Sequence, residues 1–147
     1  MEKHGLRVWK RCSDEIVMIA DSSFIIDLMR KEKMALKKLE ELKETRQIQY
    51  ITSPTVIELA VGVALAALPK AEQKRVDEIL AGFQIIALDT SSAWCAGIEI
   101  GRLRKAGKII DPIDGQIAGI ALQHDEVIVT RNVKHFEPIK GLKIESY

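Results

Sequence analysis

Short apolar runs alternate with helix-patterned segments along most of this chain, and that alternation limits the folds that it can adopt. The run IVMIA at residues 16–20 is short and rich in β-branched side chains, which is typical of a strand buried on both faces of a sheet. Similar runs predict strands at residues 50–52, 83–88, 127–130 and 142–144. Strands separated by helices indicate a parallel sheet covered on both faces. We therefore expect an α/β fold with three layers, α/β/α, around a mostly parallel central sheet.

The segments between these strands carry helical spacing of apolar residues together with start and stop signals. Ser53 followed by Pro54 predicts a cap and the first residue of a helix, and Pro69 predicts its end. Gly107 marks the end of another helix. The predicted helices cover residues 22–30, 31–46 as a continuation, 54–68, 70–81, 90–106 and 112–124.

The size and composition of the chain exclude several classes of protein. Its 147 residues fit one domain, which we place at residues 16–147 after a polar, basic N-terminal extension at 1–15 that we expect to be disordered. The net charge of +1 is no signature of a nucleic-acid or membrane-surface binder. No apolar run approaches the roughly 18 residues that span a bilayer, so we expect no membrane partner. Two cysteines, Cys12 and Cys95, give no disulfide framework and fit a reducing cytoplasm, the expected location.

Three acids interrupt otherwise apolar surroundings. Asp21 directly follows the first strand, Glu58 lies in the helix that starts at Pro54, and Asp114 lies in the first turn of the helix at 112–124. Converging buried carboxylates are costly without a cation, and a hard divalent ion prefers oxygen ligands. Each acid alone also has a purely structural interpretation: Asp21 as a helix cap, Asp114 as a partner of the helix dipole, and Glu58 as a solvent-facing residue.

A second aspartate shares the opening stretch IADSSFIIDLM with Asp21. Asp27 lies six residues further on, about 240° around a helix by the rule of 100° per residue. We therefore expect Asp27 to face solvent or a partner rather than the site.

Four blocks, in order, carry a resemblance to a known family. They are IADSSFIIDLM, TSPTVIELAVGV, KAGKIIDPIDGQIAGIAL and VIVTRNVKHFEPIKGLKI. With these blocks the chain resembles a PIN domain over residues 17–144, and most closely the VapC-type toxin ribonucleases. The resemblance implies a metal-dependent endoribonuclease that uses Mg²⁺ or Mn²⁺. It also implies an RNA substrate, an antitoxin partner and a homodimer.

The resemblance also implies roles for individual residues. Asp21, Glu58 and Asp114 would be metal ligands and, together with Asn132, the catalytic residues. Asn132 stands eighteen residues after the third acid, where a fourth acid is often found. His135 stands where many toxin members have a further acid, and this departure argues against a second metal ion. The implied supporting residues are Ser22, Thr130, Arg131 and Asp111, and the weaker RNA-binding candidates are Arg30, Lys31 and Lys134. Of two roles for Asp111, we favour the cap of the helix that begins at Pro112 over an additional carboxylate of the site.

Two other functions stay open at this point. One is an RNA-processing nuclease of the same fold that is not a toxin. The other is a degenerate, non-catalytic domain that binds RNA or protein, which the departures at Asn132 and His135 would suit.

Overall fold

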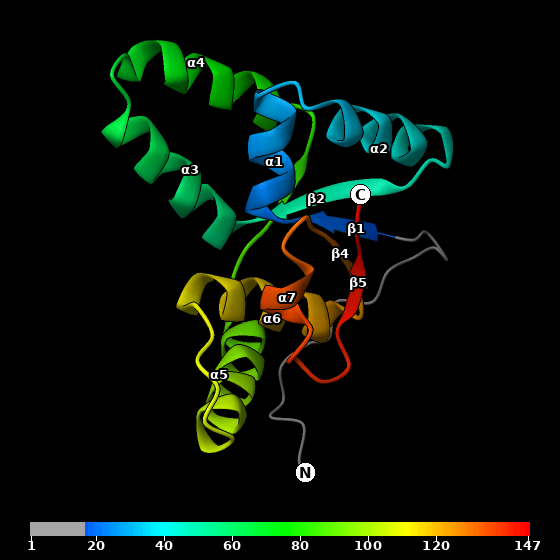
Figure 1. The fold of residues 1–147 in the computed structure, drawn as a ribbon, viewed down its shortest axis with the longest axis vertical. Coiled ribbons are helices and arrows are strands. Elements are labelled where there is room, and N and C mark those ends of the chain that lie inside the picture. The colour runs from blue at the N-terminus through cyan, green and yellow to red at the C-terminus, as the bar shows by residue number, and fades with distance from the viewer. Residues whose placement is uncertain (1–16) are drawn as a thin grey trace.

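A computed structural model describes residues 17–147 and contains a five-stranded, fully parallel sheet. The strand order is β3-β2-β1-β4-β5, so β1 lies at the centre. The predicted α/β class and parallel sheet are confirmed (Figure 1). The N-terminal extension and Ile16 lie outside the described residues. No helix in the described part is long and apolar enough to cross a membrane.

The elements follow one another as a mixed series of strands and helices. In chain order they are β1 (Val17–Ala20), α1 (Ser22–Met29), α2 (Lys33–Glu44), β2 (Ile48–Thr52), α3 (Ser53–Leu65), α4 (Pro69–Leu80), β3 (Gln84–Ile86), α5 (Thr90–Lys105), α6 (Pro112–His124), β4 (Val127–Val129), α7 (Val133–Phe136) and β5 (Lys143–Glu145).

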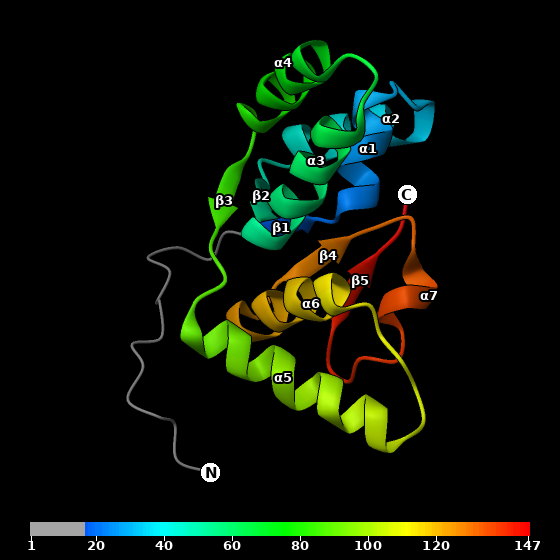
Figure 2. The same ribbon diagram turned by 90° about the vertical axis from the view of Figure 1, so that its left-hand side faces the viewer.

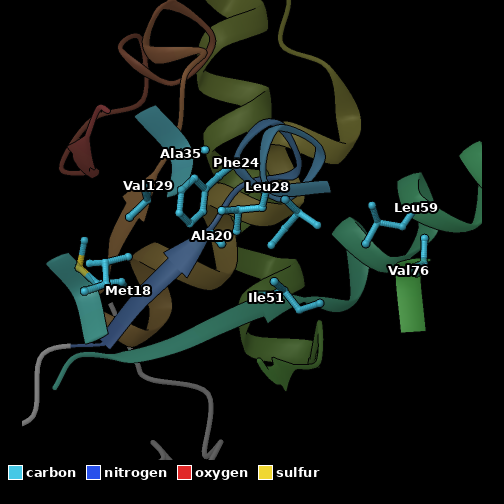
Figure 3. Close-up of a cluster of buried hydrophobic side chains, with 11 residues drawn as sticks. Met18, Ala20, Phe24, Leu28, Ala35, Ile51, Leu59, Val76 and Val129 are labelled. Atoms are coloured by element: carbon cyan, nitrogen blue, oxygen red, sulfur yellow. The ribbon is translucent and has the colours of Figure 1, made fainter. Parts of the chain in front are cut away.

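Two hydrophobic cores form on opposite faces of the sheet because successive strand side chains point to opposite faces. Met18 and Ala20 belong to one core, with residues of α1 to α4 (Figure 3). Ile19, between them in β1, belongs to the other core, with residues of α5, α6 and α7. In Figure 2 the helices α1 to α4 lie on one side of the strands, and α5 and α6 lie on the other. This is the expected arrangement of three layers.

Several predicted boundaries were wrong. The segment after α1 does not continue as a helix, because Lys31 adopts a positive φ of 57° and α2 starts only at Lys33. Thr52 rather than Ser53 caps α3: its side chain accepts a hydrogen bond from the Thr55 amide, whereas the Ser53 hydroxyl accepts one from Leu88 N. Pro69 does not end α3, which stops at Leu65, but starts α4. The four-residue helix α7 was not predicted.

The sheet order places a topological switch point beside β1. The chain moves from β1 to β2 and β3 on one side and then crosses to β4 on the other side of β1. Ala20 pairs with Val129, and the Asp21 amide donates to the Val129 carbonyl at 2.9 Å. Asp21 and Thr130 therefore lie side by side just past the carboxyl ends of their strands, where ligands bind in open α/β sheets.

Glycine allows α6 to approach α5 closely. A Cβ atom on Gly119 would lie 2.5 Å from Ala96 Cβ and 2.7 Å from the Ser92 carbonyl oxygen, so backbone would have to move. In α5, a Cβ atom on Gly101 would meet nothing within 4 Å. The two glycines form a matched pair, because an added methyl group would clash at Gly119 but would fit at Gly101.

We predict that Gly119→Ala lowers the free energy of unfolding by about 1–3 kcal/mol, because the added methyl group overpacks the contact between α5 and α6. Gly101→Ala should be neutral or raise it by up to about 1 kcal/mol, since alanine is the better helix former. Urea denaturation of both variants checks this. Equal stability of the two variants would contradict the close packing at Gly119.

Candidate active site

Asp21 lies at the centre of the candidate site and is only 2% exposed. Its Oδ2 atom accepts a hydrogen bond from Thr130 Oγ1 at 2.8 Å and another from Ser23 Oγ at 3.0 Å. Its Oδ1 atom is buried and has no hydrogen-bond partner among residues 17–147. Asp21 occupies the cap position of α1, but its side chain makes no capping hydrogen bond. A buried carboxylate oxygen without a partner is costly, so Oδ1 is a candidate ligand for a cation.

Glu58 approaches the site from α3. Its Oε1 atom accepts a hydrogen bond of 2.6 Å from Ser22 Oγ, which follows Asp21 in the chain. Burial is the main cause that raises the pKa of Glu58, and the negative charges of Asp21 and Asp111 raise it further against the opposing effect of Ser22. Glu58 therefore does not simply face solvent: it shares an electrostatic environment with Asp21.

Asp114 approaches from the first turn of α6. Burial, followed by the charges of Asp21 and Asp111, raises its pKa to about 6. His135 opposes this rise, and its Nδ1 atom lies 3.1 Å from Asp114 Oδ2. Asp111 caps α6, where its Oδ1 atom accepts hydrogen bonds from the amides of Ile113 and Asp114.

The donor set of this site suits a hard divalent cation. The charge of Asp21 raises the pKa values of both Glu58 and Asp114, which places each of these two acids within electrostatic reach of Asp21. Within residues 17–147, no group of three or more His, Cys, Asp or Glu side chains is arranged to hold a metal ion. Glu58 is hydrogen-bonded to Ser22 and Asp114 lies against His135. The unpartnered Asp21 Oδ1 and the all-oxygen character of the acids fit Mg²⁺ or Mn²⁺.

The loop after β4 holds Asp21 rather than supplying a fourth acid. The Asn132 amide donates to Thr130 Oγ1 at 2.9 Å, and the Asn132 side chain makes no capping bond at the start of α7. Thr130 is fully buried. The backbone of this loop therefore fixes the Thr130 hydroxyl that binds Asp21.

The prediction for Asp27 was wrong. Asp27 is buried, with 2% of its surface exposed, and binds Arg131 Nη1 at 2.7 and 2.9 Å and the Tyr147 hydroxyl at 2.6 Å. The helical angle that separates Asp27 from Asp21 is a property of α1 alone. It could not predict that Tyr147, 120 residues further along the chain, packs against α1 and bonds Asp27. Arg131, expected as a supporting residue of the site, thus has an intramolecular partner.

The three RNA-binding candidates, Arg30, Lys31 and Lys134, are exposed. Arg30 caps the end of α1, Lys31 follows it, and Lys134 lies in α7 beside His135. Arg30 and Glu58 both line a cavity of about 320 Å³ between α1, α3 and α4. The cavity therefore connects Arg30 with one acid of the site.

Sequence comparison supports the resemblance found in the four blocks. Residues 18–141 match the family described as "PIN domain". A tRNA(fMet)-specific endonuclease VapC from Salmonella typhimurium is 31% identical over 97 residues, which are 66% of this chain and 74% of that protein. Ribonuclease VapC1 from Methanocaldococcus jannaschii is 30% identical over 134 residues, 89% of this chain and 88% of that protein.

Solved structures show the same fold. VapBC2 from Rickettsia felis, bound to a DNA fragment of its promoter, contains a chain with a TM-score of 0.84 and 23% identity, covering 90% of this chain and 99% of that one. DNA-bound VapBC from Salmonella typhimurium contains a chain with a TM-score of 0.81 and 26% identity, covering 89% and 98%.

The raised pKa of Asp114 gives a testable pH dependence. Because its folded-state pKa of about 6 exceeds the ordinary value of 3.8, the folded state gains stability from protonation of Asp114, and this gain is lost as pH rises through 6. In metal-free buffer, Asp114→Asn should therefore be more stable than wild type at pH 7.5, and the difference should vanish towards pH 4. Thermal unfolding across this range measures it. A difference that does not change with pH would contradict the buried, charge-coupled position of Asp114.

Proposed function

The chain belongs to the PIN domain family and resembles its VapC ribonucleases, and on this premise we propose that it is a metal-dependent endoribonuclease. We propose further that it is the toxin of a toxin–antitoxin pair. The observation that carries the nuclease proposal is the buried Asp21, whose Oδ1 atom has no hydrogen-bond partner and whose charge raises the pKa values of Glu58 and Asp114. The names of the curated relatives support the RNA substrate.

The proposed metal ligands are Asp21, Asp114 and Glu58, with Glu58 acting directly or through a water molecule. A bound Mg²⁺ or Mn²⁺ ion would supply a water of lowered pKa and would neutralise charge on the phosphate. Thr130 and Ser23 hold one oxygen of Asp21 and leave the other available. Ser22 donates a hydrogen bond to Glu58, and we propose that Glu58 holds the attacking water. Asn132 adds no charge, so we propose a single resident ion.

RNA needs cationic contacts to its phosphates. Arg30, Lys31 and Lys134 are exposed at the end of α1 and on α7, and we propose that they bind the RNA backbone on either side of the acids. Such a ribonuclease acts on cellular RNA, so the cytoplasm is the proposed location.

Two protein partners belong to the proposal. The titles of the structural neighbours describe VapBC complexes, which supports an antitoxin for this chain as well. An antitoxin segment covering the cavity between α1, α3 and α4 would close the approach to Glu58. The second partner is another copy of this chain. Ile57, Val61, Leu65 and Leu68 recur along one side of α3 and beyond its end, and they are 51–81% exposed, as expected of an interface.

We predict that purified protein cleaves RNA only with Mg²⁺ or Mn²⁺ present and that Asp21→Asn lowers the rate on the order of 100-fold or more, because it removes a metal ligand. The substrate panel should include tRNA(fMet), since the name of the Salmonella typhimurium relative contains it. Asp125→Asn is the matched control: Asp125 is exposed and pairs with Lys143. Cleavage that survives chelation, or that is equal in wild type and Asp21→Asn, would reject the proposal.

We predict that Leu65→Arg shifts the chain, without its antitoxin, from dimer to monomer, because it puts a charge into the apolar side of α3. Size-exclusion chromatography with light scattering gives the mass. Met34→Arg changes a similarly exposed apolar residue on α2 and should leave the dimer intact. A wild-type chain that is monomeric at high concentration would contradict the homodimer.

A further inference from the structure

Asp27 joins three separate parts of the chain. It lies in α1, receives two hydrogen bonds from the Arg131 guanidinium in the loop after β4, and receives a third from the Tyr147 hydroxyl beyond β5. The Tyr147 ring also packs on Phe24, with a centroid distance of 4.9 Å and an interplanar angle of 59°. Burial and the bond to Asp27 raise the pKa of Tyr147, so the hydroxyl stays protonated and donates. These donors offset the cost of burying the Asp27 carboxylate.

The same loop also contacts the candidate site through its backbone. The Arg131 amide donates to Ser23 Oγ at 3.2 Å, and the Asn132 amide donates to Thr130 Oγ1 at 2.9 Å. Ser23 and Thr130 are the two hydroxyls that hold Asp21 Oδ2. Arg131 is therefore fixed twice to α1, by its amide at Ser23 and by its guanidinium at Asp27, about one helical turn further along. Because Arg131 is held at both points, the loop after β4 has little freedom to move the Thr130 hydroxyl away from Asp21.

We propose that Asp27 and Tyr147 are positioning residues of the metal site: they fix the loop after β4 through Arg131, and that loop sets the direction in which Asp21 presents its Oδ1 atom. This inference rests on the proposed function, because it concerns affinity for the divalent ion. Neither residue touches the acids of the site in any hydrogen bond of the described structure. Their effect is transmitted by Arg131, Ser23 and Thr130.

A second carboxylate with the same structural task serves as a control. Glu99 in α5, whose side chain is 13% exposed, binds the Arg102 guanidinium and the Lys140 amide, and so ties α5 to the chain between α7 and β5. In the part of the chain that the structure describes, the side chain of Glu99 bonds Arg102 and Lys140 and no residue of the candidate site. Substituting Glu99 should lower the free energy of unfolding without changing the orientation of the Asp21 carboxylate. Substituting Asp27 should lower the free energy of unfolding and also change that orientation.

The experiment is isothermal titration of the full chain with Mn²⁺ at pH 7.5 and at a temperature well below unfolding, paired with urea denaturation of each variant. The variants are Tyr147→Phe, Asp27→Asn and Glu99→Gln. Tyr147→Phe keeps the ring on Phe24 and removes only the hydroxyl. Substituting a residue that orients a metal ligand typically weakens metal binding about 10–100-fold. We expect Asp27→Asn to weaken Mn²⁺ binding about tenfold, Tyr147→Phe to weaken it several-fold, and Glu99→Gln to leave it unchanged.

A charge-preserving substitution gives a second readout. Arg131→Lys keeps a cation opposite Asp27, whereas Arg131→Ala removes it. We expect Arg131→Lys to retain most of the Mn²⁺ affinity that Arg131→Ala loses. If Asp27→Asn does not fold, Tyr147→Phe and the Arg131 pair decide the question.

The outcomes separate the two proposals. A wild-type chain that does not bind Mn²⁺ overturns the proposed metal site, and the positioning role with it. Wild-type affinity in Asp27→Asn and Tyr147→Phe overturns the positioning role alone and leaves the nuclease proposal standing. An equal loss in Glu99→Gln also overturns it, because general loosening of the fold would then explain the effect.

Discussion

The hydrogen bond from Thr130 to Asp21 joins the ends of two neighbouring parallel strands, and the geometry of the candidate site depends on it. β1 and β4 bring these residues together only because the chain has crossed from one side of β1 to the other. Asp21 Oδ2 then accepts hydrogen bonds from Thr130 and Ser23, whereas Oδ1 accepts none from the described residues and is left available to a cation. Glu58 and Asp114 arrive from α3 and α6, which pack on opposite faces of the sheet. The site thus depends on both hydrophobic cores.

Electrostatic repulsion is the cost of this arrangement in the absence of a cation. Asp21 and Asp111 both raise the pKa values of Glu58 and Asp114, and burial adds to the effect. His135 next to Asp114 and Ser22 next to Glu58 relieve part of it. On the proposed function, stability and function therefore oppose each other at these positions, as expected where acids are gathered for a metal ion.

The sequence predicted the parts of the fold that follow from local pattern. Asp21 could be placed because it directly follows a strand buried on both faces, and ligands bind at the carboxyl ends of such strands. The role of Thr130 was implied only by the family resemblance. The cap at Asp111 followed from the proline after it. Asp27 could not be placed, because its burial depends on Arg131 and Tyr147, which are 104 and 120 residues away. The helix α7 has only four residues, too few to show helical periodicity, and the contact between His135 and Asp114 depends on its position.

We propose that Asp21, Asp114 and Glu58 together hold one divalent ion at the carboxyl ends of the parallel strands. The most direct measurement is X-ray diffraction from crystals grown with Mn²⁺, with data collected for manganese anomalous scattering. We predict a single anomalous peak within ligand distance of Asp21 Oδ1 and an Asp114 oxygen, with Glu58 bound directly or through water. A map with no peak beside Asp21, at a Mn²⁺ concentration that supports RNA cleavage, would contradict this account.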